Sequence, residues 1–130
     1  MQQIKKIETT DKKKFYNYLN LKLTGLICEE PDWLANLSTA AALLWLLLDD
    51  INWAGFYLQK NDELILGPVQ GKPACTHIQI GKGVCGTAAK ELKTQVVKNV
   101  HDFPGHIACD SASKSEIVVP IVWQGKLVGV

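Results

Sequence analysis

The first half of the chain carries the hydrophobic spacing of an amphipathic helix. From Asp11 onward, apolar side chains recur at Phe15, Leu19, Leu23 and Leu26, separated by four, four and three residues. Side chains at these spacings lie on one face of an α-helix. The pattern therefore predicts a helix that begins near Asp11 and packs through this face.

A second helix is predicted from Trp33 to Leu48, with Asp32 as its N-cap. Its second half, Ala40 to Leu48, is apolar on nearly every side, which is typical of a helix covered by several neighbours. This run has nine residues, whereas a membrane-spanning helix needs roughly 20. We therefore expect a buried helix and no membrane association.

Beyond residue 50 the pattern changes to short segments bounded by turn residues, which is typical of β-strands. The predicted strands cover residues 52–59, 63–70, 76–80, 95–100, 116–123 and 126–130. A helix is expected at 84–92, and residues 101–114 are expected to form a long irregular loop. Turns at Asn61-Asp62 and Gln124-Gly125 close two pairs of strands into hairpins.

The order of these elements predicts one α/β (α+β) domain over residues 1–130 with a largely antiparallel sheet. The helices occupy about 11–48, and the sheet with its loops occupies about 51–130. A chain of 130 residues has the size of one ordinary domain. Because the chain stops inside its last predicted strand, we expect it to be truncated before the fold is complete.

Composition narrows the choice of partners. The chain is 47% hydrophobic and has a formal net charge of +1, which gives no electrostatic reason to expect nucleic acid or an anionic membrane. All 14 basic residues are lysines, so a bound carboxylate must be held by backbone N–H groups, hydroxyls or lysine. The segment Met1 to Thr10 lacks the pattern of a secretory signal. We therefore expect a cytoplasmic protein with reduced cysteines.

Three of the four cysteines, Cys75, Cys85 and Cys109, fall in irregular segments flanked by glycine or proline. Such loops on a rigid scaffold often carry reactive groups. Cys85 opens a predicted helix, where the positive end of the helix dipole should lower the pKa of the thiol. Loop amides around Cys109 and Ser111 suggest an anion-binding nest. Each thiol also has a simpler interpretation as a small buried hydrophobe, and for Cys28 we expect burial.

The strand at 52–59 brings two aromatic side chains to one face. Alternation places Trp53 and Tyr57 on one side of the strand and Ala54, Phe56 and Leu58 on the other. If the second set faces the core, the indole and the phenol line a surface that could enclose a small apolar or sulfonium-like group. The alternative is that both rings pack beneath a helix.

One carboxylate stands out in the second half. Glu116 begins a strand that is otherwise apolar through Ile121. A carboxylate in such surroundings could bind an ammonium group or, with a raised pKa, donate a proton. The alternative is a solvated glutamate at a strand end.

Five stretches carry a recognisable combination of residues: 32–37 (DWLANL), 52–58 (NWAGFYL), 67–75 (GPVQGKPAC), 81–88 (GKGVCGTA) and 103–117 (FPGHIACDSASKSEI). Together they resemble the free methionine-R-sulfoxide reductase family. The match runs from about Asp32 to the end of the chain. It includes three cysteines at matching places, which is far more specific than any single motif.

The resemblance implies a GAF-like domain, with a central antiparallel sheet flanked by helices, that reduces free L-methionine-R-sulfoxide. It implies that Cys109 attacks the substrate, that Cys75 then closes a disulfide with it, and that Cys85 is an auxiliary thiol. A thioredoxin-like dithiol would reset the disulfide, and no metal or organic cofactor is needed.

The same resemblance implies how the substrate is held. It places Trp53 and Tyr57 around the methyl-sulfoxide end and Glu116 near the amine. Capture of both charged termini would select the free amino acid over a peptide-bound residue, which would leave buried partners unpaired. The substrate carboxylate is expected at backbone N–H groups of the loop that contains Ile107, Ala108, Asp110 and Ser111.

Two other classes of function stay open. The chain could be a non-catalytic GAF sensor of a small molecule or of redox state. Cys75 with His77, and His106 with Cys109, also offer a tetrahedral donor set for zinc, although the spacing is unusual and Cys85 would be left over. The sequence does not distinguish a monomer from a homodimer.

Overall fold

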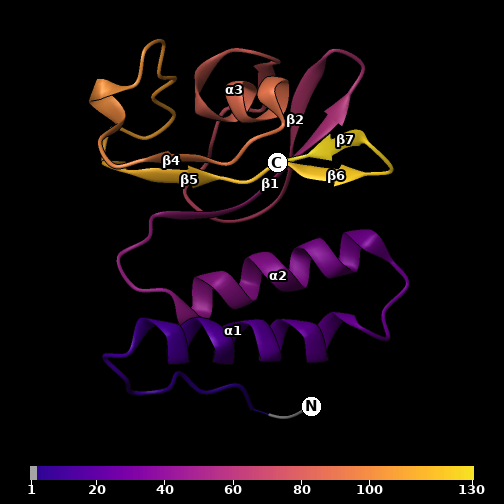
Figure 1. The fold of residues 1–130 in the computed structure, drawn as a ribbon, viewed down its shortest axis with the longest axis vertical. Coiled ribbons are helices and arrows are strands. Elements are labelled where there is room, and N and C mark those ends of the chain that lie inside the picture. The colour runs from indigo at the N-terminus through magenta and orange to yellow at the C-terminus, as the bar shows by residue number, and fades with distance from the viewer. Residues whose placement is uncertain (1–2) are drawn as a thin grey trace. The chain divides into compact units, whose positions relative to one another are not determined.

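The chain folds into two compact units in the computed structural model, which describes residues 3–130 (Figure 1). The first unit contains the described residues up to Gly55 together with Pro68–Gly71, and the second contains Phe56–Gly67 and Lys72–Val130. The prediction of a single domain over residues 1–130 therefore stays a prediction.

Two helices dominate the first unit, α1 (Lys12–Ile27) and α2 (Trp33–Leu47). Each begins at an aspartate whose side chain accepts a hydrogen bond from a backbone N–H of the first turn. Asp11 caps α1 and Asp32 caps α2. Such caps satisfy amides that have no partner within the helix. Both predicted helices and the predicted cap at Asp32 are confirmed.

The core of this unit lies between the two helices. Leu19 of α1 packs with Leu43 and Leu47 of α2. The expectation that α2 is covered on several sides is wrong, because Trp45 is 41% exposed and Leu46 is 55% exposed. The face of α2 that carries Leu43 and Leu47 is buried, and its other side stays open.

Cys28 is exposed, which contradicts the expectation that it is a small buried hydrophobe. It is the C-cap of α1, has helical backbone angles, and donates its N–H to the carbonyl of Thr24. Its side chain therefore continues the exposed face of Thr24, one turn earlier, and not the face that buries Leu19.

A five-stranded sheet runs in the order β3-β2-β1-β7-β6. The pairs β1–β7, β2–β3 and β6–β7 are antiparallel, as predicted. The β6–β7 hairpin turns at Gln124 and Gly125, whose φ angles of 49° and 74° both lie in the left-handed region, as in a type I′ turn. The strands are β1 (Trp53–Lys60), β2 (Glu63–Gly71), β3 (His77–Gln79), β6 (Ile121–Trp123) and β7 (Lys126–Gly129).

The predicted strand at 116–123 is wrong as a single element. It is divided into β5 (Glu116–Val118) and β6, which belong to different sheets. Pro120 lies at the break, where it has no N–H to donate to a ladder and restricts the residue before it. β5 instead pairs with β4 (Gln95–Val97) in a two-stranded sheet.

The remaining elements join these two sheets. α3 (Gly83–Glu91) follows β3 and packs on β4 and β5. The strand predicted at 95–100 is shorter than expected, since β4 ends at Val97 and a short 3₁₀ helix, η1 (Val100–Asp102), follows it. This helix begins the long loop that leads to β5. Among residues 3–130, no helix combines the length and the hydropathy needed to cross a bilayer.

Small residues let α3 approach the chain that precedes it. A Cβ on Gly86 would lie 2.4 Å from the carbonyl oxygen of Gln79 and 3.1 Å from the amide nitrogen of Gly81. Both neighbours are backbone atoms and cannot rotate away. The N–H of Gly81 also donates to the carbonyl of Gly86 at 2.7 Å. Gly86 is therefore required by close packing.

We predict that Gly86→Ala lowers the free energy of unfolding by about 2 kcal/mol, because the added methyl forces the backbone apart. Gly25→Ala is the matched control, since a Cβ at Gly25 in α1 meets nothing within 4 Å. That substitution should raise the free energy of unfolding by about 0.5–1 kcal/mol through helix propensity. Urea denaturation measures both. Changes of the same sign would contradict the packing argument.

Candidate active site

Two loops and one helix start of the second unit carry the three cysteines singled out by the sequence. Cys75 lies between β2 and β3, Cys85 lies in the first turn of α3, and Cys109 lies in the loop between η1 and β5. Cys75 and Cys109 form a disulfide across 34 residues of sequence, with their Cα atoms 5.7 Å apart. The two thiols that the family resemblance pairs are thus bonded in the structure.

Tyr57 fixes the loop that carries Cys75. Its side chain is 4% exposed, and its hydroxyl donates to the carbonyl oxygen of Cys75 at 2.7 Å. Burial, with the nearby Cys85 and Glu116, raises the pKa of Tyr57 to about 12. The hydroxyl therefore keeps its proton at neutral pH and remains a donor.

The loop that carries Cys109 is tightened by its own backbone. The N–H of Cys109 donates to the carbonyl of Ile107 at 3.1 Å. The side chain of Asp110 accepts from the N–H of Ala112 at 2.9 Å. Ile107 also lies against the start of α3, since a Cβ on Gly83 would be 3.0 Å from its Cδ1. The Cys109 loop is thereby placed beside the helix that carries Cys85.

The loop remains open to solvent where the substrate carboxylate is expected. Ile107, Ala108 and Ser111 are exposed, and Asp110 is half-buried. The structure thus gathers these four residues on one accessible loop beside Cys109. Their role as a carboxylate cradle stays a prediction.

A second link joins the two cysteine loops. The Nζ of Lys72 lies 3.1 Å from Oδ2 of Asp110. Lys72 precedes Cys75 by three positions, and Asp110 directly follows Cys109. Lys72 was not predictable as a site residue, because nothing in the spacing of the sequence indicates that these two loops meet.

Cys85 does not have the low pKa expected at a helix start. Burial, with a further contribution from the Glu116 carboxylate, raises the pKa of this thiol to about 12. The cost of an unsolvated thiolate exceeds the attraction of the helix dipole, and the negative neighbour adds to that cost. The expected thiolate at Cys85 is therefore wrong.

Glu116 is half-buried at the start of β5, so the solvated alternative does not apply. Burial raises its pKa, and His106 acts in the opposite direction. The Nε2 of His106 is 3.9 Å from Oε1 of Glu116. A carboxylate in this setting gains from a cationic partner, which offsets part of its desolvation.

Trp53 begins β1, is half-buried and belongs to the first unit. Its place in an aromatic wall with Tyr57 stays a prediction. Tyr57 itself is more deeply buried than a wall residue needs, so its ring packs in the second unit while its hydroxyl holds the Cys75 loop.

The arrangement weighed for zinc is not formed. Cys75 and Cys109 are bonded to each other. His77 lies 3.1 Å from Glu63, and His106 faces Glu116. Within residues 3–130, three or more histidine, cysteine or acidic side chains do not gather anywhere in a geometry that could hold a metal.

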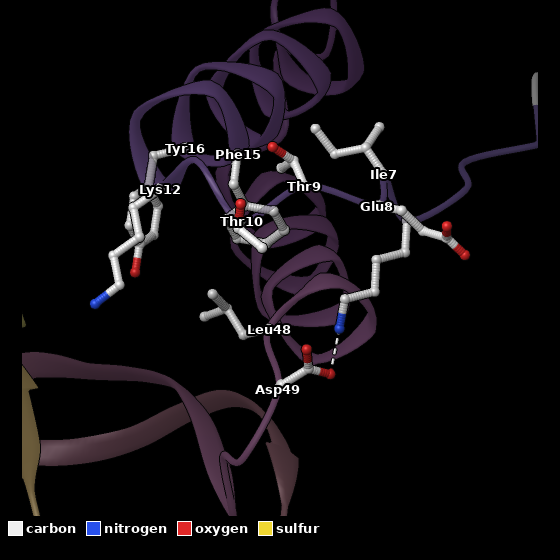
Figure 2. A pocket seen from close by; sticks show the side chains of 10 residues that line it. Ile7, Glu8, Thr9, Thr10, Lys12, Phe15, Tyr16, Leu48 and Asp49 are labelled. Atoms are coloured by element: carbon white, nitrogen blue, oxygen red, sulfur yellow. Dashed lines mark hydrogen bonds and ion pairs between the residues drawn. The ribbon is translucent and has the colours of Figure 1, made fainter.

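A separate hollow of about 570 Å³ lies in the first unit (Figure 2). Phe15 of α1 and Leu48 point toward one another across it, and the ion pair of Lys6 with Asp49 lies at one side. None of the ten residues that line it is a cysteine. It carries none of the candidate chemistry.

Comparison with known proteins decides the family. The GAF domain family matches residues 33–130. The free methionine-R-sulfoxide reductase of Escherichia coli is 51% identical over 120 residues, which cover 92% of this chain and 73% of that protein. The enzyme of that name in Saccharomyces cerevisiae is 52% identical over 128 residues, which cover 92% of this chain and 71% of that protein. The chain belongs to the free methionine-R-sulfoxide reductase family.

Solved structures of this family confirm the predicted GAF fold. The free methionine-R-sulfoxide reductase of Neisseria meningitidis, solved in complex with its substrate, matches with a TM-score of 0.90 and 42% identity, over 95% of this chain and 74% of that chain. The reduced form of Staphylococcus aureus fRMsr matches with a TM-score of 0.86 and 55% identity, over 97% of this chain and 79% of that chain.

The raised pKa of Cys85 predicts that this thiol reacts slowly with an alkylating reagent. With the Cys75–Cys109 disulfide intact, iodoacetamide at about pH 7.5 should label the exposed Cys28 first and Cys85 at least about 100-fold more slowly. Glu116→Gln should speed labelling of Cys85, because it removes a negative charge beside the thiol. Peptide mass spectrometry measures both sites. Equal labelling of Cys28 and Cys85 would contradict the burial argument.

Proposed function

We propose that this chain reduces free L-methionine-R-sulfoxide to methionine with Cys109 as the nucleophile. The observation that carries the proposal is the Cys75–Cys109 disulfide, held between two loops of the second unit. It is the product expected when two thiols supply the two electrons of the reaction. Family membership supplies the reaction class, because close relatives are named for this activity.

In the first step the Cys109 thiolate attacks the electrophilic sulfur of the sulfoxide. A carboxyl group or water supplies a proton to the sulfoxide oxygen, which weakens its bond to sulfur. The oxygen is transferred to Cys109, methionine leaves as the reduced thioether, and Cys109 becomes a sulfenic acid. Exposure of the Cys109 loop gives the substrate access to this sulfur.

In the second step the Cys75 thiol attacks the sulfur of the Cys109 sulfenic acid. The sulfur–sulfur bond forms, the S–O bond breaks, and the hydroxyl leaves as water with the thiol proton. A thioredoxin-like dithiol then reduces the disulfide and restores both thiols. Cys85 is the auxiliary thiol of this scheme.

Selection of the free amino acid follows from the two charged ends of the substrate. Glu116 binds the ammonium group, which supplies the positive partner that a half-buried carboxylate needs. Backbone N–H groups from Ile107 to Ser111 bind the carboxylate. A peptide-bound sulfoxide has neither charge and leaves these groups unpaired.

We further propose that residues 1–130 act as one GAF domain in the cytoplasm, where a dithiol reductant keeps the cysteines in use. The scheme requires no metal and no organic cofactor. A homodimer is compatible with it, since the cysteine pair lies within one chain.

A redox sensor is the second candidate. A putative GAF sensor protein from Burkholderia vietnamiensis is 54% identical and matches with a TM-score of 0.89, over 92% of this chain and 77% of that chain. In such a protein the Cys75–Cys109 disulfide would itself be the signal. Turnover separates the two candidates, because a sensor needs none.

The deciding experiment is consumption of free L-methionine-R-sulfoxide by reduced protein with excess dithiothreitol. The S epimer and a peptide-bound sulfoxide are run beside it, and methionine is quantified. We expect turnover of the free R form alone. Cys109→Ser should abolish it, because the nucleophile is lost, and Cys28→Ser should retain it. Equal activity of these two variants, or no turnover by fully reduced protein, would rule out the proposed reaction.

Glu116→Gln should raise KM for the free R form about tenfold to 100-fold, the range for losing a charged hydrogen-bond partner.

The same substitution should make the fold more stable relative to the parent as the pH rises, because it removes the charged carboxylate. Burial raises the pKa of Glu116 above its unfolded value of 4.5, so the neutral carboxyl group stabilises the fold, and this contribution is complete at pH values below 4.5. That contribution is lost as the pH rises through the folded pKa. Above about pH 5, the Tm of Glu116→Gln should therefore fall less with rising pH than the Tm of the parent. Parallel curves of Tm against pH would contradict this expectation.

A further inference from the structure

Two links, one covalent and one ionic, join the Cys75 loop to the Cys109 loop. One is the disulfide, with 5.7 Å between the Cα atoms. The other is the ion pair between Lys72 and Asp110, with 3.1 Å between Nζ and Oδ2. The disulfide opens in every catalytic cycle of the proposed function, whereas the redox chemistry does not consume the ion pair.

The acidic half of this pair is held in place by the chain around it. Oδ1 of Asp110 accepts from the N–H of Ala112 at 2.9 Å, and its carbonyl oxygen accepts from the N–H of Ser113 at 3.2 Å. The Asp110 side chain is only 19% exposed. With Oδ1 engaged on its own loop, Oδ2 is left directed at Lys72. An aspartate fixed in this way presents a defined acceptor to its partner.

The basic half belongs to a short, restrained segment. Lys72 is followed by Pro73, whose ring fixes its own φ and restricts the residue before it. The far end of the segment is held by Tyr57, which donates to the carbonyl of Cys75 at 2.7 Å. The segment from Lys72 to Cys75 is therefore anchored at both ends, and its Lys72 end is anchored on the residue next to Cys109.

We propose that Lys72, through its ion pair with Asp110, is a positioning residue that keeps Cys75 within reach of Cys109 while the disulfide is open. The inference rests on the proposed function, in which Cys75 resolves an oxidised Cys109. Lys72 contacts neither sulfur in this role. It acts on the resolving step by raising the fraction of time that the two loops are in contact.

The step in question is the condensation of Cys75 with the Cys109 sulfenic acid. The Cys75 sulfur attacks Sγ of Cys109, the S–O bond breaks, and the oxygen leaves as water with the Cys75 proton. Both sulfurs share the oxidation already present in the sulfenic acid, so the step needs no further oxidant. The rate of this step depends on how often Cys75 lies in line with the S–O bond of Cys109. The earlier attack of Cys109 on the substrate does not depend on the position of Cys75.

The test compares Lys72→Gln, Lys72→Arg and Lys126→Gln in single turnover. Lys126→Gln is the control, because it removes the same charge from the β6–β7 hairpin. Each reduced protein is mixed with one equivalent of free L-methionine-R-sulfoxide. Methionine release, with loss of the first free thiol, reports the first step, and loss of the second free thiol reports disulfide closure. Dimedone captures the Cys109 sulfenic acid that has not yet been resolved.

We expect Lys72→Gln to release methionine at the parent rate and to close the disulfide about fivefold more slowly, the upper range for a partly exposed ion pair. More Cys109 should be trapped by dimedone. Lys72→Arg should restore closure, and Lys126→Gln should match the parent. High salt should slow closure in the parent and leave Lys72→Gln unchanged, because it screens the ion pair.

Parent-rate closure by Lys72→Gln, or an equal slowing of both steps, would overturn the positioning role. A parallel series in a Cys28→Ser background forms the sulfenic acid with hydrogen peroxide instead of substrate. Suppose that Lys72→Gln closes the disulfide slowly after peroxide treatment, but that the parent releases no methionine from the sulfoxide. That result would reject the proposed function and support the role of Lys72 in disulfide closure. Normal closure of Lys72→Gln with peroxide would reject that role whatever happens to the sulfoxide.

Discussion

The chemistry of the second unit depends on one desolvated carboxylate and the two neutral groups beside it. Glu116 is half-buried near Cys85 and Tyr57, and its charge adds to the burial that raises the pKa of both. Tyr57 therefore keeps the proton that it donates to the carbonyl of Cys75. Cys85 stays a thiol and does not compete as a nucleophile with the two cysteines of the exposed loops. The protonation of Tyr57 and Cys85 is thus set mainly by their own burial, and the charge of Glu116 adds to it.

This arrangement is costly without a ligand and well suited to one that carries a positive charge. A half-buried carboxylate whose histidine partner lies as far as 3.9 Å away has capacity to bind a cation. In the function proposed above, the ammonium group of an amino acid would be the positive partner of this carboxylate, which β5 already places. The burial that makes the charged carboxylate costly would then also strengthen its attraction for that ammonium group.

Features decided by a few adjacent residues were predictable from the sequence. The cap at Asp32 and the Gln124-Gly125 turn need only local chemistry, and both form as expected. Features decided by neighbours distant in sequence were not. The helix start at Cys85 indicated a low thiol pKa, but burial beside Glu116 reverses the sign. The Lys72–Asp110 pair joins loops 38 positions apart and has no local signal.

The break at Pro120 separates the roles of two sheets. Glu116 begins β5 in the two-stranded sheet, whereas β6, only a few positions later, belongs to the five-stranded sheet. The ribbon of β4 and β5 rests on α3 and shares no ladder with the main sheet. Changes in the ribbon can therefore alter the charge or reach of the residue at its head while the larger sheet keeps its hydrogen bonds. For protein engineering, Pro120 therefore makes the ribbon that carries Glu116 separable from the five-stranded sheet, so that the two can be redesigned independently.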